Sequence, residues 1–328
     1  MTFTNRTHRK KAEKTIRRPV IIICKIVGIV CLAVVFAILA LNLLKFAIYP
    51  DYYAIKTDIC TNPGLGDGFV CQGICEYEEG GKFFISGYMQ GEKASRIYVT
   101  DTENDSYYVS LSLAGEDFKG HVGGIATHGE EIYIVCDHAI HLLPLQRLLD
   151  AKNGDVLEIV DAIEMDNAGS SVYADDNYLY VGEFHNGAEY ITYHPYDTPD
   201  GRYHAIITRY SLDDLTSPDK IYSIRDKVQG ICFTPNGKIC LSTSFGFTDS
   251  HYYVYDESKA TDSGLTLHGA PVFYLWDVEK TISGPAMAEG IDSYNGQIIT
   301  LSESASNKYI FGKFFFADKI VALDLVGD

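Results

Sequence analysis

The sequence predicts an all-β propeller domain that follows one N-terminal membrane-spanning helix. Residues 72–328 contain five copies of one pattern: a short apolar strand, a polar turn and an alternating apolar strand. Self-similarity with a period of this size is typical of propellers and solenoids. Strand signals dominate the repeats, and helix signals are almost confined to residues 1–48, which favours a propeller.

The N-terminal helix is predicted from Ile26–Leu44, 19 residues whose only strongly polar side chain is Asn42. At ~1.5 Å per residue this run spans roughly 28 Å, about one bilayer core. A cleavable signal peptide is the alternative, but its apolar region usually holds only ~7–15 residues. The sequence therefore predicts a basic cytoplasmic tail (1–18), a transmembrane anchor (19–48), a connecting segment (49–71) and a propeller (72–328).

Charge divides the chain at the anchor. Residues 1–50 hold nine Lys and Arg and one acid, so their net charge is +8. The other 278 residues have a net charge of −25, which gives −17 for the whole chain. Basic residues before the anchor predict a cytoplasmic N-terminus, with everything after Tyr49 outside the cytoplasm at the cell membrane. A domain this acidic is not expected to bind nucleic acid, because Lys and Arg must neutralise the phosphates. It is expected to attract cations.

The repeats align at a small residue near the start of each copy. These residues are Gly73, Gly124, Ser171, Gly230 and Gly290, and successive ones are 51, 47, 59 and 60 residues apart. Each copy offers four strands, and four-stranded sheets repeated around an axis make propeller blades. Five blades are predicted, or six if one repeat is too degraded to recognise. The last copy lacks an outer strand, which Tyr53–Ile59 could supply to close the ring.

The fourth copy shows the expected layout most clearly. We expect its strands at Gly230–Phe233, Lys238–Thr243, His251–Tyr255 and Val272–Trp276. A two-residue turn at Asn236-Gly237 would place Cys240 opposite Phe233 rather than Cys232. A bridge between Cys232 and Cys240 is therefore not expected, and Cys60–Cys71 is the expected disulfide.

The repeat, with its Gly-Ile start as in QGICEYEEGGKFFISGY and QGICFTPNGKICLSTS, resembles that of the NHL, gluconolactonase and strictosidine-synthase-like propellers. The resemblance covers roughly residues 72–325 and concerns the fold pattern. Those families mostly have six blades, so none of their catalytic residues is carried over. A five-bladed propeller on a membrane anchor is also similar in architecture to the calcium-activated nucleotidases.

Two columns of the repeat are expected to meet at the axis. They are the residue before the Gly-Ile pair and the residue that ends the second strand. Together they supply three carboxylates and two amides: Glu183, Glu289, Glu303, Gln72 and Gln229. Oxygen ligands of this kind suit Ca²⁺. The alternative is that these glutamates are solvated rim residues of an acidic domain.

Histidines and tyrosines extend this candidate site. His121 and His185 are candidates for a general base or ligand near the same mouth. The third copy carries a long insertion, residues 184–205, whose Tyr190, Tyr193 and Tyr196 could stack on a sugar or form a lid. A self-packed surface loop is the alternative interpretation.

These observations predict a membrane-anchored propeller outside the cytoplasm. We expect its axial face to bind a small polar or carbohydrate ligand, or a partner, with a structural calcium as an accompanying expectation. The alternative function is a calcium-dependent hydrolase acting on a lactone, an ester or a phosphate compound. In that case the ion would polarise the substrate and His121 or His185 would move a proton.

Overall fold

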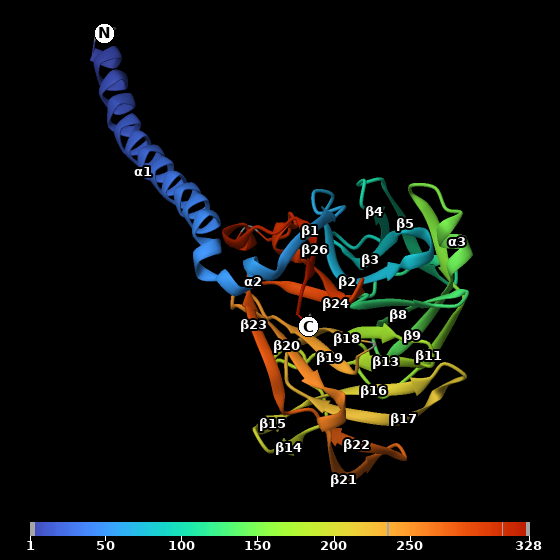
Figure 1. The fold of residues 1–328 in the computed structure, drawn as a ribbon. Coiled ribbons are helices and arrows are strands. Elements are labelled where there is room, and N and C mark those ends of the chain that lie inside the picture. The colour runs from blue at the N-terminus through green and yellow to red at the C-terminus, as the bar shows by residue number, and fades with distance from the viewer. Residues whose placement is uncertain (1–3, 235, 310, 326–328) are drawn as a thin grey trace.

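A five-bladed β-propeller with one projecting helix is the architecture of the chain. The computed structural model describes residues 4–234, 236–309 and 311–325, with side chains from Val20 onward. Within these residues five sheets of four or more strands surround a central axis, and helix α1 (Thr4–Ile48) projects away from them (Figure 1). The prediction of a five-bladed propeller is confirmed, and the six-bladed alternative does not apply.

Each blade runs outward from an innermost strand. The first has β2 (Phe69–Tyr77), β3 (Lys82–Met89), β4 (Arg96–Asp101) and β5 (Ser106–Leu113), with β6 (Glu116–Asp117) and β10 (Asp155–Ile159) added to β5. The second has β7 (Gly124–His128), β8 (Glu131–Cys136), β9 (Ala139–Pro144) and β11 (Asp161–Glu164). The short helix α3 (Leu145–Leu149) follows β9.

The third blade has β12 (Ser171–Ala174), β13 (Tyr178–Gly182), β16 (Ala205–Ser211) and β17 (Asp214–Ile224); a hairpin of β14 (Tyr196–Thr198) and β15 (Gly201–Tyr203) lies in its long insertion. The fourth has β18 (Val228–Phe233), β19 (Lys238–Thr243), β20 (Ser250–Asp256) and β23 (Val278–Gly284). The fifth has β24 (Ala288–Tyr294), β25 (Gln297–Ser302) and β26 (Lys319–Leu323).

The N-terminal strand β1 (Lys56–Thr61) completes the fifth blade. It pairs antiparallel with β26, with Lys56 opposite Leu323 and Thr61 opposite Lys319. The predicted closing strand is therefore confirmed, although it begins at Lys56 and not at Tyr53, since Pro50–Ile55 form the short helix α2. Both ends of the propeller meet in one sheet. Closure satisfies the backbone groups of the outer edge of β26, which would otherwise be a free template for pairing with other chains.

The innermost strands pack backbone against backbone around the axis, and this explains the recurring glycine. A Cβ atom added to Gly230 would lie 2.6 Å from Ile291 N and 2.9 Å from the Cα of Gly290. A Cβ on Gly290 would in turn lie 2.9 Å from the Cα of Gly73. Real Cβ atoms do not approach backbone this closely, so the repeat keeps glycine where neighbouring blades touch.

The prediction that residues 272–276 form the outer strand of the fourth blade is wrong. The fourth blade is completed by β23, while β22 (Ala270–Tyr274) pairs in parallel with β17 of the third blade and carries β21 (Thr261–Leu267) on its outer side. The reason is apolar matching: Ile221 of β17 lies opposite Val272, and both side chains are fully buried. Strand pairing here satisfies an edge that the third blade would leave open.

The predicted register at the Asn236-Gly237 turn is also wrong by one residue. Thr234 N donates to Lys238 O at 2.9 Å, and this pairing shifts the hairpin so that Cys232 lies opposite Cys240. Both thiols are nevertheless free, as are Cys60 and Cys71, so the expected disulfide is absent from the described structure. Cys60 lies on the outermost strand of the fifth blade, whereas Cys71 lies on the innermost strand of the first.

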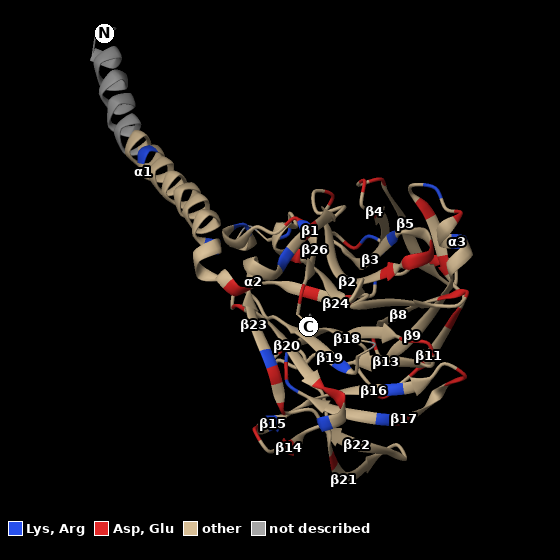
Figure 2. Ribbon diagram, in the orientation of Figure 1, with Lys and Arg blue, Asp and Glu red and all other residues tan. Residues whose placement is uncertain are grey.

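Helix α1 is long and apolar enough to cross a membrane. Its segment Val20–Ile48 has a mean hydropathy of 3.0 over its most apolar window, and none of that window is buried in the protein. Acidic residues are instead spread over the propeller, as the red segments of the ribbon in Figure 2 show. The fold thus separates an apolar helix from an acidic propeller, which is compatible with a single-pass anchor.

Candidate functional site

A cavity of 540 Å³ opens at the axial face of the propeller. Four of the predicted axial residues line it: Gln72, Gln229, Glu289 and Glu303. His121 and Tyr190, predicted beside them, line it as well. The volume lies in the range of small-molecule sites, ~300–1,000 Å³. The structure therefore brings together most of the candidate residues, although they come from several blades.

Bulges on the innermost strands aim three of these side chains. The ladder of β2 and β3 skips a residue between Cys71 and Gly73, so Gln72 has no partner on β3. Gln229 is skipped in the same way on β18, and the register of β24 shifts across Glu289. A bulge leaves its extra residue out of the ladder and redirects its side chain. The repeat position before the Gly-Ile pair thus reaches the axis through a shared backbone irregularity.

Glu289 is the most unusual group in the cavity. Its side chain is only 2% exposed, and what is exposed faces the cavity. No side-chain or backbone donor of the described residues hydrogen-bonds its carboxyl group. Burial first, and the neighbouring Glu303 charge second, raise the pKa of Glu289 well above its usual value. A buried acid without a partner is costly, so this group is poised for a ligand or a proton.

Glu303 begins the short 3-10 helix η3 (Glu303–Ala305), directly after β25. Burial raises its pKa to about 7, against hydrogen bonds from Tyr309 and Gln72 and the charge of Lys308, which favour the ionised form. At neutral pH the two glutamates cannot both ionise easily without a cation or a bound donor. The pair therefore holds a proton near pH 7, which a free carboxyl group would release.

His121 and Gln72 extend the acid pair into a chain of hydrogen bonds. His121 Nε2 lies 2.6 Å from Gln72 Oε1, and Gln72 Nε2 donates to Glu303 Oε2 at 3.2 Å. Burial first, and then the charge of Lys308, lower the pKa of His121 to about 4. The imidazole is thus neutral at physiological pH. It contacts the cavity as a hydrogen-bonding group rather than as a charge.

Sequence patterns missed a further group of side chains that line the cavity. Lys308 donates to Tyr88 Oη, and Tyr88 Oη lies 3.4 Å from Tyr309 Oη. Lys308 is the cation nearest to the glutamates, and its charge lowers the pKa of both. These residues follow β25 in the connection to β26 or end β3, outside the two aligned columns, so only the tertiary structure reveals them.

Aromatic side chains that follow β13 and β19 also line the cavity. Tyr190 packs edge-on against Phe184 at a centroid distance of 5.5 Å, and Phe245 lies 6.3 Å from Phe184. Phe247 also lines the cavity and is 58% exposed. The three tyrosines predicted to stack on a ligand lie in different places. Tyr190 lines the cavity, Tyr193 is 84% exposed to solvent, and Tyr196 of β14 packs against Tyr274.

Glu183, the third predicted metal ligand, does not line the cavity. It is buried, and its carboxylate accepts hydrogen bonds from Ala168 N and Ile206 N and lies 3.0 Å from His194 Nδ1. Backbone amides and a histidine therefore satisfy its oxygens. Of the three carboxylates expected around one ion, the structure places only Glu289 and Glu303 together.

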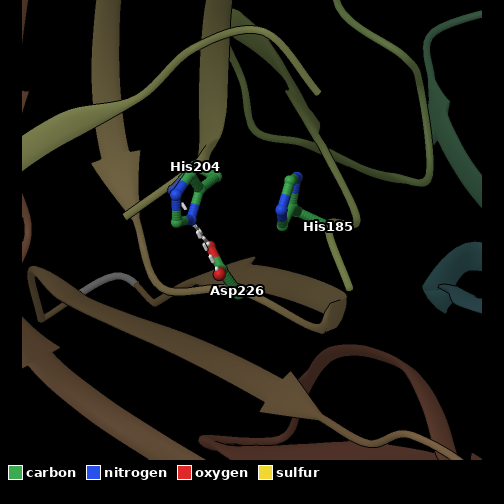
Figure 3. Close-up of side chains that lie close together, drawn as sticks. All are labelled: His185, His204 and Asp226. Carbon is green, nitrogen blue, oxygen red and sulfur yellow. Dashed lines mark hydrogen bonds and ion pairs between the residues drawn. The ribbon is translucent and has the colours of Figure 1, made fainter. Parts of the chain in front are cut away.

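His185 lies in a separate cluster with His204 and Asp226 (Figure 3). His204 Nδ1 bonds Asp226 Oδ2 at 2.9 Å, and the imidazole rings of His185 and His204 stack at 4.6 Å with an interplanar angle of 16°. An ion must lie near the plane of each imidazole that binds it. Two nearly parallel, stacked rings cannot both meet that requirement, so one ring would have to rotate before the cluster could hold a metal.

Comparisons with known proteins give fold likenesses only. No known protein family matches the chain, and no curated protein matches it in sequence. Its fold is similar to the PQQ-bound aldose sugar dehydrogenase of Streptomyces coelicolor, with 17% identity over 76% of this chain and 77% of that one, at a TM-score of 0.44. It is also similar to a putative glucose dehydrogenase of Thermus thermophilus, with 12% identity over 82% of this chain and 99% of that one, at a TM-score of 0.44.

Hydrazine synthase of Kuenenia stuttgartiensis is similar at 11% identity and a TM-score of 0.38. This chain covers 57% of that protein's length, and 76% of this chain is aligned. At such identities and TM-scores the likenesses carry no argument about activity. The resemblance to known propellers is one of fold, and the blades themselves are established by the strand pairing.

Proposed function

We propose that this chain is a membrane-anchored propeller whose axial cavity binds a small carbohydrate ligand outside the cytoplasm. The observation that carries the proposal is Glu289: a buried carboxyl group that faces the cavity and receives no hydrogen bond from the described residues. When protonated, such a group donates one hydrogen bond and accepts others. A sugar hydroxyl, which also donates and accepts, is its natural partner.

The walls of the cavity support a sugar over other polar ligands. Gln72, Gln229 and Glu303 supply planar amide and carboxyl groups next to Glu289. Rings at the mouth, including Tyr190 and Phe245, offer flat apolar faces. Aromatic faces carry a negative quadrupole that attracts the polarised C–H groups on one side of a pyranose ring. Polar groups at the base and apolar rings at the rim thus match the two kinds of surface of a sugar.

Orientation is part of the same proposal. The basic residues that precede the apolar segment Val20–Ile48 of α1 favour an N-terminus in the cytoplasm, which would place the propeller on the other side of the membrane. The acidic charge of the propeller then contributes to its solubility there.

Calorimetric titration of the full chain in nanodiscs with neutral sugars, amino sugars and CaCl₂ tests the function. A neutral sugar should bind with little proton release, because the glutamate pair keeps its proton. A cation should displace that proton. Glu289→Leu should abolish sugar binding, whereas Glu289→Gln, which resembles the protonated acid, should retain it within about tenfold, or ~1.4 kcal/mol. Glu116→Gln, on an exposed strand, is the matched control.

Two results would contradict the proposal: no sugar binds the unmodified chain, or Glu289→Leu binds as well as the unmodified chain does. Titration at two pH values, on either side of the pKa of Glu303, separates a sugar from a cationic ligand. Affinity for a cation should rise with pH as the pair ionises, while affinity for a neutral sugar should not.

A calcium-dependent hydrolase is the second candidate, because a divalent cation would neutralise Glu289 and Glu303 beside His121. Ca²⁺ takes six to eight oxygen ligands. Gln229 could supply one, while the Gln72 oxygen already accepts from His121. The melting temperature with EDTA and with millimolar Ca²⁺ tests this candidate, since binding at 100 times the dissociation constant adds about 2.7 kcal/mol of stability. A rise that Glu289→Gln abolishes would support it, and no rise would eliminate it.

A further inference from the structure

The last part of the apolar segment of α1 packs against the propeller. Side chains of α1 from Val20 to Phe36 are exposed, but from Ala37 onward several are partly covered by the propeller. The uncovered 17 residues would span only ~26 Å at 1.5 Å per residue, less than the ~30 Å of a bilayer core. A bilayer core of average thickness would therefore extend past Phe36, to the level where the propeller begins.

A phenylalanine-rich segment lies at that level. It is the 3-10 helix η4 (Phe311–Phe315), which lies in the connection between β25 and β26. Asn42 of α1 donates from Nδ2 to Lys313 O at 2.9 Å and to Phe314 O at 3.3 Å, and Lys45 donates to Phe316 O at 3.1 Å. The one strongly polar residue of the apolar run thus fixes η4 against the helix.

Exposed aromatic rings continue from η4 to the cavity. Phe311 is 59% exposed and Phe316 is 38% exposed. Phe247 packs edge-on against Phe311 at a centroid distance of 5.9 Å and also lines the axial cavity. Large exposed apolar patches on a soluble surface mark sites of interaction, and here the patch adjoins a membrane-spanning helix.

We propose that Phe247, Phe311 and Phe316, here called the aromatic edge, insert into the leaflet on the propeller's side of the membrane. The partner is the lipid bilayer that holds α1. The helix brings the aromatic edge to the height of the headgroup–acyl boundary, where apolar side chains bind by burying their surface. The mouth of the axial cavity, which Phe247 lines, then opens beside the membrane surface. The proposal does not depend on which ligand the cavity binds.

Fluorescence of single tryptophans in the full chain tests whether the aromatic edge inserts into the bilayer. The chain has one tryptophan, Trp276, which Trp276→Phe removes. On that background, Phe311→Trp and Phe247→Trp place a probe on the aromatic edge. Leu265→Trp is the control: Leu265 is 49% exposed and lies on β21, at the far side of the propeller from α1 (Figure 1).

Each variant is reconstituted, one chain per disc, in phosphatidylcholine nanodiscs with and without bromine on the acyl chains near the headgroups. A ring seated at the headgroup–acyl boundary should emit at shorter wavelength and lose roughly half of its emission to brominated lipid. Leu265→Trp should show neither effect. Equal quenching at all three positions, or none at positions 311 and 247, overturns the proposal.

Two further outcomes keep the test decisive. A blue-shifted probe that brominated lipid does not quench would mean that protein covers the aromatic edge, such as a second copy of this chain, and would also overturn the proposal. Because the probes occupy two independent positions, misfolding of one variant, detected as a lowered melting temperature, leaves the other to decide. Loss of sugar binding would bear on the proposed function and not on the membrane insertion of the aromatic edge.

Discussion

His121 and Gln72 share a hydrogen bond of 2.6 Å that fixes the tautomer of the histidine. The amide nitrogen of Gln72 donates to Cys71 O and to Glu303, so its oxygen faces His121 and can only accept. The proton of the neutral imidazole therefore resides on Nε2, and Nδ1 keeps its lone pair. A chain of hydrogen bonds thus connects the imidazole to the acid pair through a neutral side chain.

Replacing that neutral side chain by an acid should raise the pKa of His121. In Gln72→Glu a carboxylate would accept the Nε2 proton, and an opposite charge at hydrogen-bonding distance favours the imidazolium ion. NMR titration of ¹⁵N-histidine in the full chain measures the pKa. Gln229→Glu adds a charge to the same cavity without a hydrogen bond to His121, so it should have the smaller effect. An unchanged titration in Gln72→Glu would contradict the assigned contact.

Glu289 should make the protein less stable as the pH rises. Its pKa is higher in the folded chain than in the unfolded chain, so the folded state holds a proton that the unfolded state releases above about pH 4.5. The stabilisation is complete below that pH. It is lost progressively as the pH rises from there through the raised pKa of the folded state.

Glu289→Gln should therefore raise the free energy of unfolding near neutral and alkaline pH, because the amide has no proton to lose. Near pH 4 the variant and the unmodified chain should differ little. Chemical denaturation at several pH values measures the difference. Asp292, whose pKa burial raises to about 7, adds a dependence of the same sign that should persist in the variant. If the free energies of unfolding of the variant and the unmodified chain changed in parallel with pH, Glu289 would not be the source of the pH dependence.

Gly230→Ala should destabilise the ring of inner strands. The added methyl group would meet the backbone of β24 at 2.6 Å, and backbone cannot move aside without displacing a neighbouring blade. Overpacking of this kind typically costs about 1–3 kcal/mol. Gly66→Ala is the control, because nothing lies within 4 Å of its added Cβ and its φ is not positive. Equal melting temperatures of the two variants would show that the blades are packed more loosely.

The six propeller thiols should resist alkylation in the folded state. All six are buried, and burial raises the pKa of Cys136 and Cys240 to about 12. Alkylation needs a thiol that is both accessible to the reagent and ionised, and buried thiols with raised pKa values are neither. Mass spectrometry after treatment with maleimide should find the propeller cysteines modified only in denaturant. Rapid modification of Cys60 or Cys71 in the native chain would mean that the fifth and first blades separate readily.

The sequence could predict most of the fold because its signals are local. Alternation of apolar residues, turn residues at regular spacing and a small residue at one point of each copy depend on neighbours along the chain. They predicted five blades and the closing strand, which pairs with β26 as expected. They failed where partners are distant: β22 joins the third blade because Val272 matches Ile221, a choice between two edges that no local pattern encodes.

The candidate site divides in the same way. Repetition alone selected Gln72, Gln229, Glu289 and Glu303, and the structure places all four around one cavity. Glu183 occupies an equivalent column, yet it does not line the cavity, and two backbone amides and His194 satisfy its carboxylate. Which way a side chain turns depends on local bulges and on what packs behind it, and these are settled only when the blades assemble.

What the sequence by itself determined is the division of the chain into an apolar helix and a repeated β domain, because burial of apolar surface acts through composition and period. What only the tertiary structure decided is the environment of each polar group. Glu289 is unusual because blades far apart in sequence exclude water from it, while the hairpin of β24 and β25 sets Glu303 beside it. The cost of burying a charge depends on everything that surrounds it, and in a propeller those surroundings come from the whole length of the chain.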